Sequence, residues 1–497
     1  MSIREQIVAK RRARIRATGH TLGAAIPETR GVPLVTFPAD PPLICEIKRR
    51  SPSRGSIDAL LDPVELAGRY RDRGARSISV LTEEDHFAGS LADLVAVKHA
   101  YPGLAVLRKD FLLDEEDIRV SHRAGADAVL LIASILSGEE LARMHALTLE
   151  LGMTALVELH DEEDFAKARP VAPPLVGINA RDLSTFRVDL LTPVRLRRRI
   201  DWPHRAVFES GIFAQEDALL AATSGFHAIL VGEAAVRDQN AIGGILRGLR
   251  GTLPRQESAP AAGRDAQAAP SRDFWQRLCD RIRDDRPLAK ICGITNRDDA
   301  ELATELGADL LGFVFADSPR RAEPALLEDL TGLPALKVAV VVTGGANGPL
   351  ADDVRDLLDR GLVDAVQFHG DEEPDGCASQ AFPYYRALRL ARAADTASID
   401  RYRCPRVLID ARVASGYGGT GARVAPEVVR AAAGRRPLWL AGGLSDENIA
   451  EVVLEWRPEL VDVSSGLEAA PGRKDPNRLR RFFTELPYGR DLSRLLR

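Results

Sequence analysis

The sequence predicts an α/β protein built from two tandem (β/α)8 barrels, or TIM barrels, joined by a short flexible linker. Short apolar runs alternate with helix-like segments eight times in the first half, and the same alternation repeats in the second half. Each series spans about 210 residues, close to the roughly 250 residues of a typical barrel. A stretch with almost no core-forming residue separates the two series. At 497 residues the chain is also too long for one hydrophobic core.

The segment from Ile3 to Ala17 is rich in Arg and Lys and carries apolar residues at helical spacing. This pattern predicts an amphipathic helix that leads into the first barrel. A short basic helix on a chain with a net charge of -5 is more typical of a solvated face than of a nucleic-acid site. We therefore expect a first domain over residues 1–254 with an N-terminal helical extension.

Eight short apolar runs predict the strands of the first barrel. They are Leu43–Lys48, Ser77–Leu81, Leu104–Lys109, Ala128–Ile132, Thr154–Leu159, Leu175–Asn179, Ala206–Ser210 and Ala228–Val231. Helix-like segments lie between them, such as Pro63–Arg73, Leu91–Ala100, Glu115–Ala124, Gly138–Leu151, Glu162–Ala168 and Gln215–Thr223. A doubly wound open sheet is the competing fold, but the Gly-x-Gly-x-x-Gly turn expected after its first strand is absent.

Residues 255–272 are expected to form the linker, because their composition offers almost nothing to a core. The second domain, residues 273–497, should begin with a short helix from Asp273 to Arg283. The strands expected after it are Leu288–Cys292, Leu310–Phe315, Leu336–Val342, Ala365–His369, Tyr385–Leu390, Arg406–Asp410, Leu438–Ala441 and Leu460–Ser464.

The overall composition excludes several classes of protein. With 67 basic and 72 acidic residues, nothing in the charge balance favours nucleic acid or an acidic membrane. No apolar run approaches the length that spans a bilayer, so we expect a cytoplasmic protein. The five cysteines are scattered without a CxxC pair, which predicts a reducing compartment and no metal site. We also expect a monomer without a cofactor, since no nicotinamide or flavin fingerprint is present.

Two charged residues lie in the first predicted strand. Glu46 and Lys48 share one face, because side chains alternate along a strand. Burying both is costly unless they pair with one another or take part in chemistry. A structural ion pair inside the barrel is one interpretation. Their position just before a loop favours the other, because parallel barrels carry their active sites at the carboxyl ends of the strands.

Other strands of the first series also end in polar residues: Lys109, Glu158, Asn179 and Glu209. Each one alone could be a cap or a core ion pair. Together with the two residues of the first strand they converge on one barrel mouth, which favours an active site. Lysines and carboxylates at close quarters shift each other's pKa values, as general acid and base catalysis requires.

The last two strands of each series run into glycine-containing tips. These tips are Glu209-Ser210-Gly211, Val231-Gly232-Glu233, Ala441-Gly442-Gly443 and Ser464-Ser465-Gly466. Glycine lets backbone N–H groups approach an anion closely, and barrels commonly bind phosphate after strands seven and eight. Tight turns use glycine in any case, but the repetition at the same place in both series favours two phosphate sites.

The first half resembles the indole-3-glycerol phosphate synthase family. The matching motifs, in order over residues 43–236, are Cys-Glu-Ile-Lys-Arg-x-Ser-Pro-Ser, Leu-x-Lys-Asp-Phe, Val-Glu-Leu-His, Gly-Ile-Asn-x-Arg-Asp-Leu and Glu-Ser-Gly-Ile. The resemblance implies a substrate with an anthranilate carboxylate, an open deoxyribulose chain and a phosphate, which is cyclised with loss of carbon dioxide and water.

The same resemblance implies roles for the residues of the mouth. Lys109 would be the general acid at the ketone, and Glu158 the acid or base that handles the departing hydroxyl. The residues that would orient the substrate or stabilise charge are Glu46, Lys48, Asn179 and Glu209. Those that would hold the phosphate and the adjacent polyol are Lys48, Ser51, Arg181, Ser210, Gly211, Gly232 and Glu233.

In the second series, Cys292 ends the first strand and Asp410 ends the sixth. A buried cysteine is usually a small hydrophobe, but at a strand mouth beside a phosphate site its thiolate could act as a base. The glycine-rich stretch 415–421 that follows Asp410 is expected to form a loop able to close over a ligand.

The second half resembles the phosphoribosylanthranilate isomerase family over residues 288–470. The motifs that carry the resemblance are Lys-Ile-Cys-Gly-Ile-Thr, Gly-Phe-Val-Phe, Ser-Pro-Arg, Gln-Phe-His-Gly and Asp-Val-Ser-Ser-Gly. It implies an Amadori rearrangement, in which Asp410 protonates the ribose ring oxygen and Cys292 removes the proton from the neighbouring carbon. His369 is interpreted as a structural residue. The residues that would bind substrate are Arg320 at the anthranilate carboxylate, Asp462, and the phosphate loops at Gly442, Gly443, Ser464, Ser465 and Gly466.

The two implied reactions are consecutive, because the isomerase product is the synthase substrate. One alternative is that one or both barrels only bind a phosphosugar and have lost acid and base residues. Another is a different phosphosugar isomerase or an aldolase, which should show a Schiff-base lysine and tolerate loss of Glu158.

Overall fold

The computed structural model describes residues 3–51, 55–56, 61–182, 187–238, 240–250, 273–345, 348–378, 382–411 and 423–487. The chain divides into two compact units, residues 1–255 and 256–497. The predicted linker at 255–272 and the predicted loop at 415–421 lie outside the described residues.

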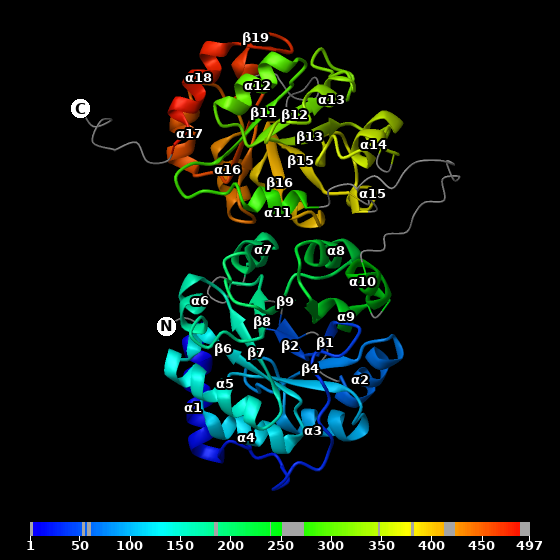
Figure 1. The fold of residues 1–497 in the computed structure, drawn as a ribbon, viewed down its shortest axis with the longest axis vertical. Coiled ribbons are helices and arrows are strands. Elements are labelled where there is room, and N and C mark those ends of the chain that lie inside the picture. The colour runs from blue at the N-terminus through cyan, green and yellow to red at the C-terminus, as the bar shows by residue number, and fades with distance from the viewer. Residues whose placement is uncertain are drawn as a thin grey trace, which may run out of the picture. The chain divides into compact units, whose positions relative to one another are not determined.

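The first unit contains a closed barrel of eight parallel strands (Figure 1). The strands are β1 (Leu43–Ile47), β4 (Ser77–Leu81), β5 (Ala105–Lys109), β6 (Ala128–Ile132), β7 (Thr154–Leu159), β8 (Leu175–Asn179), β9 (Arg205–Glu209) and β10 (Ala228–Val231). Neighbours in the barrel follow chain order, and β10 closes it by pairing with β1. The predicted strands are confirmed to within a residue or so at their ends.

The interior of this barrel is filled by every second residue of the strands. Ala105 and Leu107 of β5 and Val207 of β9 belong to one buried apolar cluster. Lys109 and Glu209 continue the same alternation toward the carboxyl ends of those two strands. The layer of polar residues at the mouth is therefore the upper continuation of the apolar core.

Helices surround the barrel (Figure 1). They are α1 (Ile3–Thr18), α2 (Pro63–Asp72), α3 (Leu91–Ala100), α4 (Glu115–Ala124), α5 (Gly138–Glu150), α6 (Glu162–Ala168), α7 (Leu191–Arg197), α8 (Gln215–Thr223), α9 (Glu233–Arg237) and α10 (Ala241–Leu249). The N-terminal helix is not only a solvated basic face: Arg11 is buried and lies 3.2 Å from carboxylate oxygens of both Asp110 and Asp117. This pairing fixes α1 to the barrel.

The second unit contains a second closed barrel of eight parallel strands. The strands are β11 (Leu288–Cys292), β12 (Leu310–Val314), β13 (Leu336–Val341), β14 (Ala365–Phe368), β15 (Tyr384–Leu390), β16 (Val407–Ala411), β17 (Trp439–Leu440) and β18 (Leu460–Val463). The α/β fold class with two tandem (β/α)8 barrels is thereby confirmed.

The helices of the second unit are shorter on average than a standard barrel helix. They are α11 (Phe274–Cys279), α12 (Arg297–Glu305), α13 (Leu326–Asp329), α14 (Asp352–Asp359), α15 (Pro374–Ala378), the 3₁₀ helix η2 (Ala393–Arg401), α16 (Pro426–Ala433), α17 (Ile449–Trp456), the 3₁₀ turn η3 (Ser465–Leu467) and α18 (Pro476–Glu485). The helix predicted at 273–283 ends at Cys279, four residues early. A hairpin of β19 (Glu468–Ala470) and β20 (Arg473–Lys474) follows β18.

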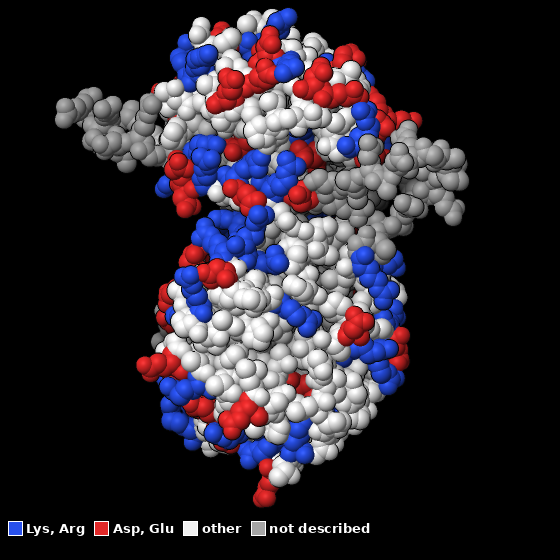
Figure 2. All heavy atoms as spheres, viewed as in Figure 1, with Lys and Arg blue, Asp and Glu red and all other residues white. Residues whose placement is uncertain are grey.

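Basic and acidic side chains are mixed over the visible face of each unit, with large uncharged areas between them (Figure 2). Among the residues that the structure describes, no helix is both long and apolar enough to cross a bilayer. The one described cluster with metal-ligand spacing is His20 with Asp114 and Asp117, which lies outside both pockets described below.

Candidate active sites

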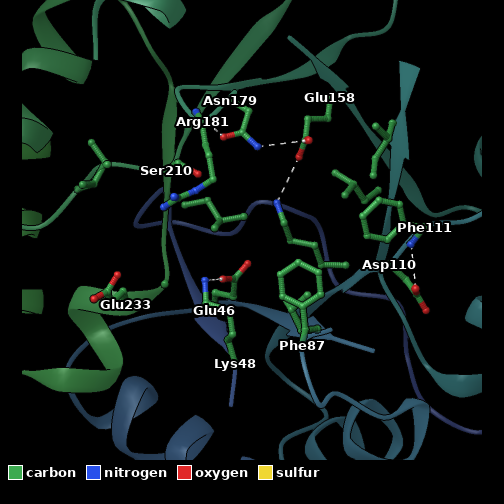
Figure 3. A pocket seen from close by; sticks show the side chains of 18 of the residues that line it. Glu46, Lys48, Phe87, Asp110, Phe111, Glu158, Asn179, Arg181, Ser210 and Glu233 are labelled. Atoms are coloured by element: carbon green, nitrogen blue, oxygen red, sulfur yellow. Dashed lines mark hydrogen bonds and ion pairs between the residues drawn. The ribbon is translucent and has the colours of Figure 1, made fainter. Parts of the chain in front are cut away.

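Strand pairing brings six predicted residues of the first barrel to one mouth (Figure 3). The parallel register places Lys109 beside Leu81, Glu158 beside Ile132, and Asn179 beside Glu209. Glu46 lies in β1 and Lys48 directly after it. All except Glu209 line a single pocket, and Glu209 lies directly behind Lys109.

Lys109 is the centre of this mouth. Its Nζ lies 3.3 Å from Glu158 Oε2 and also pairs with Glu209 Oε2. The amide of Asn179 donates to Glu158 Oε1 at 3.4 Å, and its Oδ1 accepts the backbone N–H of Arg181 at 3.0 Å. Lys48 Nζ forms a separate pair with Glu46 Oε1 at 2.7 Å. The site therefore holds two lysines and three carboxyl groups.

Burial and mutual charge separate the proton affinities of these groups. Burial alone would lower the pKa of Lys109, but the carboxylates of Glu209, Glu158 and Glu46 outweigh it and raise the pKa above its ordinary value. Burial raises the pKa of Glu209 to about 8, against the opposing charge of Lys109. Burial also acts to raise the pKa of Glu158, but Lys109 and His160 hold it below the ordinary value. Burial and mutual charge thus move the pKa values of the two carboxyls beside Lys109 in opposite directions, with that of Glu158 the lower.

One side of the pocket is apolar and the other is suited to an anion (Figure 3). The apolar lining consists of Leu81, Phe87, Phe111, Leu130, Ile132, Ile212, Phe213 and Leu230. The polar lining outside the charged cluster consists of Asp110, Arg181, Ser210, Gly211, Gly232 and Glu233. A flat aromatic acid with a phosphorylated tail fits such a division.

The chain after β9 and β10 forms the glycine-containing tips that the sequence predicts. Ser210 and Gly211 both have positive φ angles, 68° and 81°. A Cβ atom on Gly232 would lie 2.7 Å from Glu46 Oε1 and 3.0 Å from Lys48 Nζ, so only glycine fits there. Ser51 belongs to the short strand β2 (Arg50–Ser51), which pairs with β3 (Gly55–Ser56), and its side chain is outside the description.

The second barrel brings Cys292 and Asp410 into one pocket. Asp410 is held at both oxygens: its Oδ1 accepts the N–H of Ala411 at 2.8 Å, and its Oδ2 lies 3.1 Å from His369 Nε2. His369 Nδ1 lies in turn 2.9 Å from the amide of Gln367. His369 was interpreted as structural, and it does support Asp410, but it also lines the pocket.

Lys290 is a member of this site that sequence analysis did not single out. It lies two residues before Cys292, so strand alternation alone places both on one face. Its Nζ donates to Gln367 Oε1 and to Asp462 Oδ2, each at 2.6 Å. Burial raises the pKa of the Cys292 thiol, whereas the positive charges of Lys290 and Lys474 lower it.

Arg320 lines the same pocket but already has a carboxylate partner. Its Nε and Nη2 both donate to Glu468 Oε2, at 3.0 and 2.9 Å. Lys474 Nζ donates to Glu468 Oε1 at 3.1 Å and to the carbonyl of Cys292 at 2.7 Å. The hairpin β19–β20 thus connects the arginine to the end of β11, a link that no local sequence pattern indicated.

The phosphate tips of the second barrel line the pocket together with Asp462. Gly442 and Gly443 have φ angles of 87° and 64°. A Cβ atom on Gly442 would lie 2.8 Å from Asp410 Oδ1, and one on Gly466 would lie 2.0 Å from the carbonyl of Leu444. Ser464 and Ser465, which directly precede Gly466, line the same pocket.

Two protein-family models match the chain. The model described as indole-3-glycerol phosphate synthase matches residues 4–245, and the model described as N-(5'-phosphoribosyl)anthranilate (PRA) isomerase matches residues 289–485. Each match covers one of the two barrels.

Curated relatives match both halves. A multifunctional tryptophan biosynthesis protein of Phycomyces blakesleeanus is 30% identical over 502 residues, which cover 89% of this chain and 62% of that protein. A tryptophan biosynthesis protein of Phytophthora nicotianae is 30% identical over 500 residues, covering 87% of this chain and 88% of the relative. An indole-3-glycerol phosphate synthase of a Nocardioides species is 44% identical over 205 residues, or 41% of this chain and 78% of the relative. The chain therefore spans less than two thirds of the Phycomyces protein.

Proposed function

This chain belongs to the indole-3-glycerol phosphate synthase and phosphoribosylanthranilate isomerase families, and we propose that it is a bifunctional enzyme of tryptophan biosynthesis. The domain at residues 273–497 isomerises N-(5-phosphoribosyl)anthranilate to 1-(2-carboxyphenylamino)-1-deoxyribulose 5-phosphate. The domain at residues 1–254 cyclises and decarboxylates that product to indole-3-glycerol phosphate. Residues 255–272 connect the two domains.

The observation that carries the synthase assignment is Lys109 between two carboxyl groups at the edge of an apolar pocket. As the aryl carbon attacks the ketone, Lys109 protonates the developing alkoxide. Carbon dioxide is then lost, and the electron pair of the broken C–C bond moves into the ring system, where it neutralises the cationic intermediate formed by ring closure. The hydroxyl then leaves as water after taking up a second proton, which reaches it from solvent, and Glu158, acting as a carboxylate, takes the proton that the neighbouring carbon loses.

The remaining polar residues of the first pocket bind and orient the substrate. The Lys48–Glu46 pair and Asn179 face the reacting part, and Glu209 holds Lys109 in place from behind. The residues proposed to hold the phosphate and polyol are Lys48, Ser51, Arg181, Ser210, Gly211, Gly232 and Glu233. The left-handed backbone of Ser210 and Gly211 at the pocket wall supports this, because such turns can present successive N–H groups to an anion.

The isomerase assignment depends on Cys292 and Asp410 in one pocket. Asp410 donates a proton to the ribose ring oxygen, the ring C–O bond breaks, and Cys292 removes the C2 proton to give the enol that tautomerises to the ketose. Asp462 Oδ1 is buried and has no hydrogen-bond partner among the described residues, which supports a bond from it to a substrate hydroxyl.

The same pocket supplies binding groups for the two ends of the substrate. Arg320 faces the anthranilate carboxylate. The phosphate lies at the tips formed by Gly442, Gly443, Ser464, Ser465 and Gly466. We further propose a cytoplasmic monomer with small phosphorylated substrates as its only partners; all five cysteines are buried, and their scattered spacing without a CxxC pair fits a reducing compartment.

The direct test supplies the purified chain with N-(5-phosphoribosyl)anthranilate and follows indole-3-glycerol phosphate by its indole fluorescence. We expect product without any added enzyme, cofactor or metal. Supplying the rearranged ketose tests the synthase alone. If the ketose is converted but the aldose is not, the isomerase assignment is wrong; if neither is converted, the synthase assignment is wrong.

A further inference from the structure

A buried histidine lies behind Glu158 in the first barrel. His160 follows β7, and its Nε2 lies 3.0 Å from Glu158 Oε1. Its Nδ1 lies 3.2 Å from Asp164 Oδ2, in the first turn of α6, and the same oxygen accepts the backbone N–H of His160 at 3.0 Å. The side chain is 11% exposed, and His160 does not line the pocket. It therefore reaches the site only through Glu158.

We propose that His160, held by Asp164 as an imidazolium, is a positioning residue that keeps Glu158 ionised and correctly oriented during the synthase reaction. This inference rests on the proposed function of the first barrel. It assigns Asp164 and His160 to one chain of contacts that ends at a carboxylate touching the substrate.

The geometry requires the charged form of the ring. Both ring nitrogens face carboxylate oxygens, so a neutral imidazole would point one lone pair at a negative charge. Only the imidazolium places a positive charge against both carboxylates, although Nε2 lies against Glu158 Oε1 as an ion-pair contact and is not aligned for a hydrogen bond. Burial would lower the pKa of His160, but Asp164 and Glu158 outweigh it and raise the pKa to about 10.

The surrounding charges explain what this cation adds. Glu158 Oε2 faces Lys109, and Oε1 faces His160 and the amide of Asn179. A side-chain hydrogen bond with Glu209, on β9, also lowers the pKa of Glu158. When Lys109 gives its proton to the substrate, it no longer offsets the charge of Glu158, whereas His160 does not exchange a proton with substrate and still does. Without His160, Glu158 would take up a proton at that moment and would cease to be a base.

The first experiment compares the pH dependence of synthase kcat in the full chain and in His160→Asn, because kcat reports groups in the enzyme–substrate complex, where Lys109 transfers its proton. We expect the acid limb of the variant to move up by about one pH unit or more, with activity approaching that of the unmodified chain at higher pH. Asp164→Asn keeps the ring but removes its anchor, so it should shift the same limb in the same direction. A variant that loses activity equally at every pH would overturn the inference, because that is the result of structural damage alone.

His145→Asn is the matched control. His145 is a buried histidine of α5 in the same unit, outside the pocket and without a carboxylate contact in the described part of the chain. Its replacement carries the cost of losing a buried imidazole but should leave the acid limb unshifted. A shift in His145→Asn as large as that in His160→Asn would also overturn the inference.

A second measurement does not depend on activity. Nitrogen-15 NMR of the histidine rings, with the His160 signals assigned by their loss in His160→Asn, reports protonation directly. Both ring nitrogens of His160 should carry protons at pH 8, where an ordinary histidine with a pKa of about 6.5 is neutral. A His160 signal that titrates near that ordinary value would overturn the inference, and this result would leave the proposed function untouched. An inactive first barrel with a protonated His160 would instead count against the proposed function.

Discussion

The two barrels place a lysine in different layers, and this difference separates their chemistry. Lys109 ends β5, lines its pocket and is 16% exposed, so it can reach a substrate. Lys290 lies one layer deeper, has a fully buried side chain and does not line its pocket. What lines the pocket above Lys290 is Cys292. The first barrel thus presents the cation itself, whereas the second uses a cation to influence a thiol.

The same contrast appears in the first strand of each barrel. In the first barrel, Glu46 of β1 lies deeper and Lys48, directly after β1, lies nearer the mouth. In the second barrel, Lys290 of β11 lies deeper and Cys292, the last residue of that strand, lies nearer the mouth. In both pairs the two residues are separated by one position, so they share a face of the strand. The seventh strand of each barrel, β9 in the first and β17 in the second, is followed by a glycine-containing tip. A common barrel scaffold with glycine-containing tips at the same places would therefore support the two proposed reactions through one exchanged layer of side chains.

The largest expected effect separates the two sites completely. Lys109→Met should lower synthase kcat by about 10²- to 10⁴-fold, the usual contribution of a general acid, and leave the isomerase unchanged. Asp410→Asn should do the reverse, because the amide cannot supply the proton. Each variant is assayed with the aldose and with the ketose separately. One substitution that abolishes both activities would contradict two independent sites.

Removing the deep cation should have the next largest effect. Lys290→Met leaves the Asp462 carboxylate buried without its partner, which should lower the free energy of unfolding of the second barrel by about 3–5 kcal/mol. Lys290 is the leading positive charge that lowers the pKa of Cys292, so its loss raises that pKa. A thiolate forms only above the pKa, and the rise of isomerase activity with pH should therefore begin at higher pH. Denaturant unfolding and the pH profile of kcat/KM measure the two effects.

Lys337→Met is the control for this variant. Lys337 is also a buried lysine of the second barrel, on β13, but it donates to the carbonyl of Leu333 and lies outside the pocket. Its loss should lower the free energy of unfolding through the lost hydrogen bond to Leu333, and the isomerase pH profile should keep its position. An unshifted profile in Lys290→Met would mean that the deep cation is purely structural.

Much of this contrast could be predicted from the sequence, because it depends on local periodicity. The end of each strand shows in the pattern, and parallel strands bring those ends together, so the sequence alone predicts that Lys109 and Glu158 share one mouth and that Cys292 and Asp410 share another. Lys290 could have been found by the alternation that identified Glu46.

Other partners could not be predicted, because they depend on where the chain goes after a strand ends. His160 reaches Glu158 only because α6 begins at once and Asp164 holds the ring. Glu468 reaches Arg320 across a sequence separation of 148 residues. Such contacts are set by loop and hairpin geometry, which hydrophobic patterning does not encode.

A smaller effect should come from two glycines that make room for reactive side chains. A Cβ atom on Gly177 of β8 would lie 2.0 Å from Glu209 Oε1, and one on Gly312 of β12 would lie 2.8 Å from Cys292 Sγ. Gly177→Ala should therefore displace Glu209 and lower only the synthase, and Gly312→Ala should displace Cys292 and lower only the isomerase, each by about tenfold or more. Separate kcat measurements of the two reactions check this.

The matched controls are Gly103→Ala and Gly332→Ala, one in each unit. Neither position has any atom within 4 Å of an added Cβ, and neither has a positive φ angle. Both reactions should proceed as in the unmodified chain. If Gly177→Ala and Gly312→Ala behaved like these controls, the packing around Glu209 and Cys292 would not limit catalysis.

The smallest expected effect concerns the carboxylate that holds Arg320 before substrate arrives. Glu468 occupies one edge of the guanidinium and offsets its charge, so the substrate carboxylate meets a partly neutralised arginine. Glu468→Gln keeps an acceptor in place but removes the negative charge, and the isomerase KM should fall by about two- to fivefold with kcat unchanged. Glu468→Ala releases both Arg320 and the buried Lys474, so its KM should rise instead. If both variants raised KM equally, Glu468 would act on Arg320 only by holding it in position, and its charge would have no part in substrate binding.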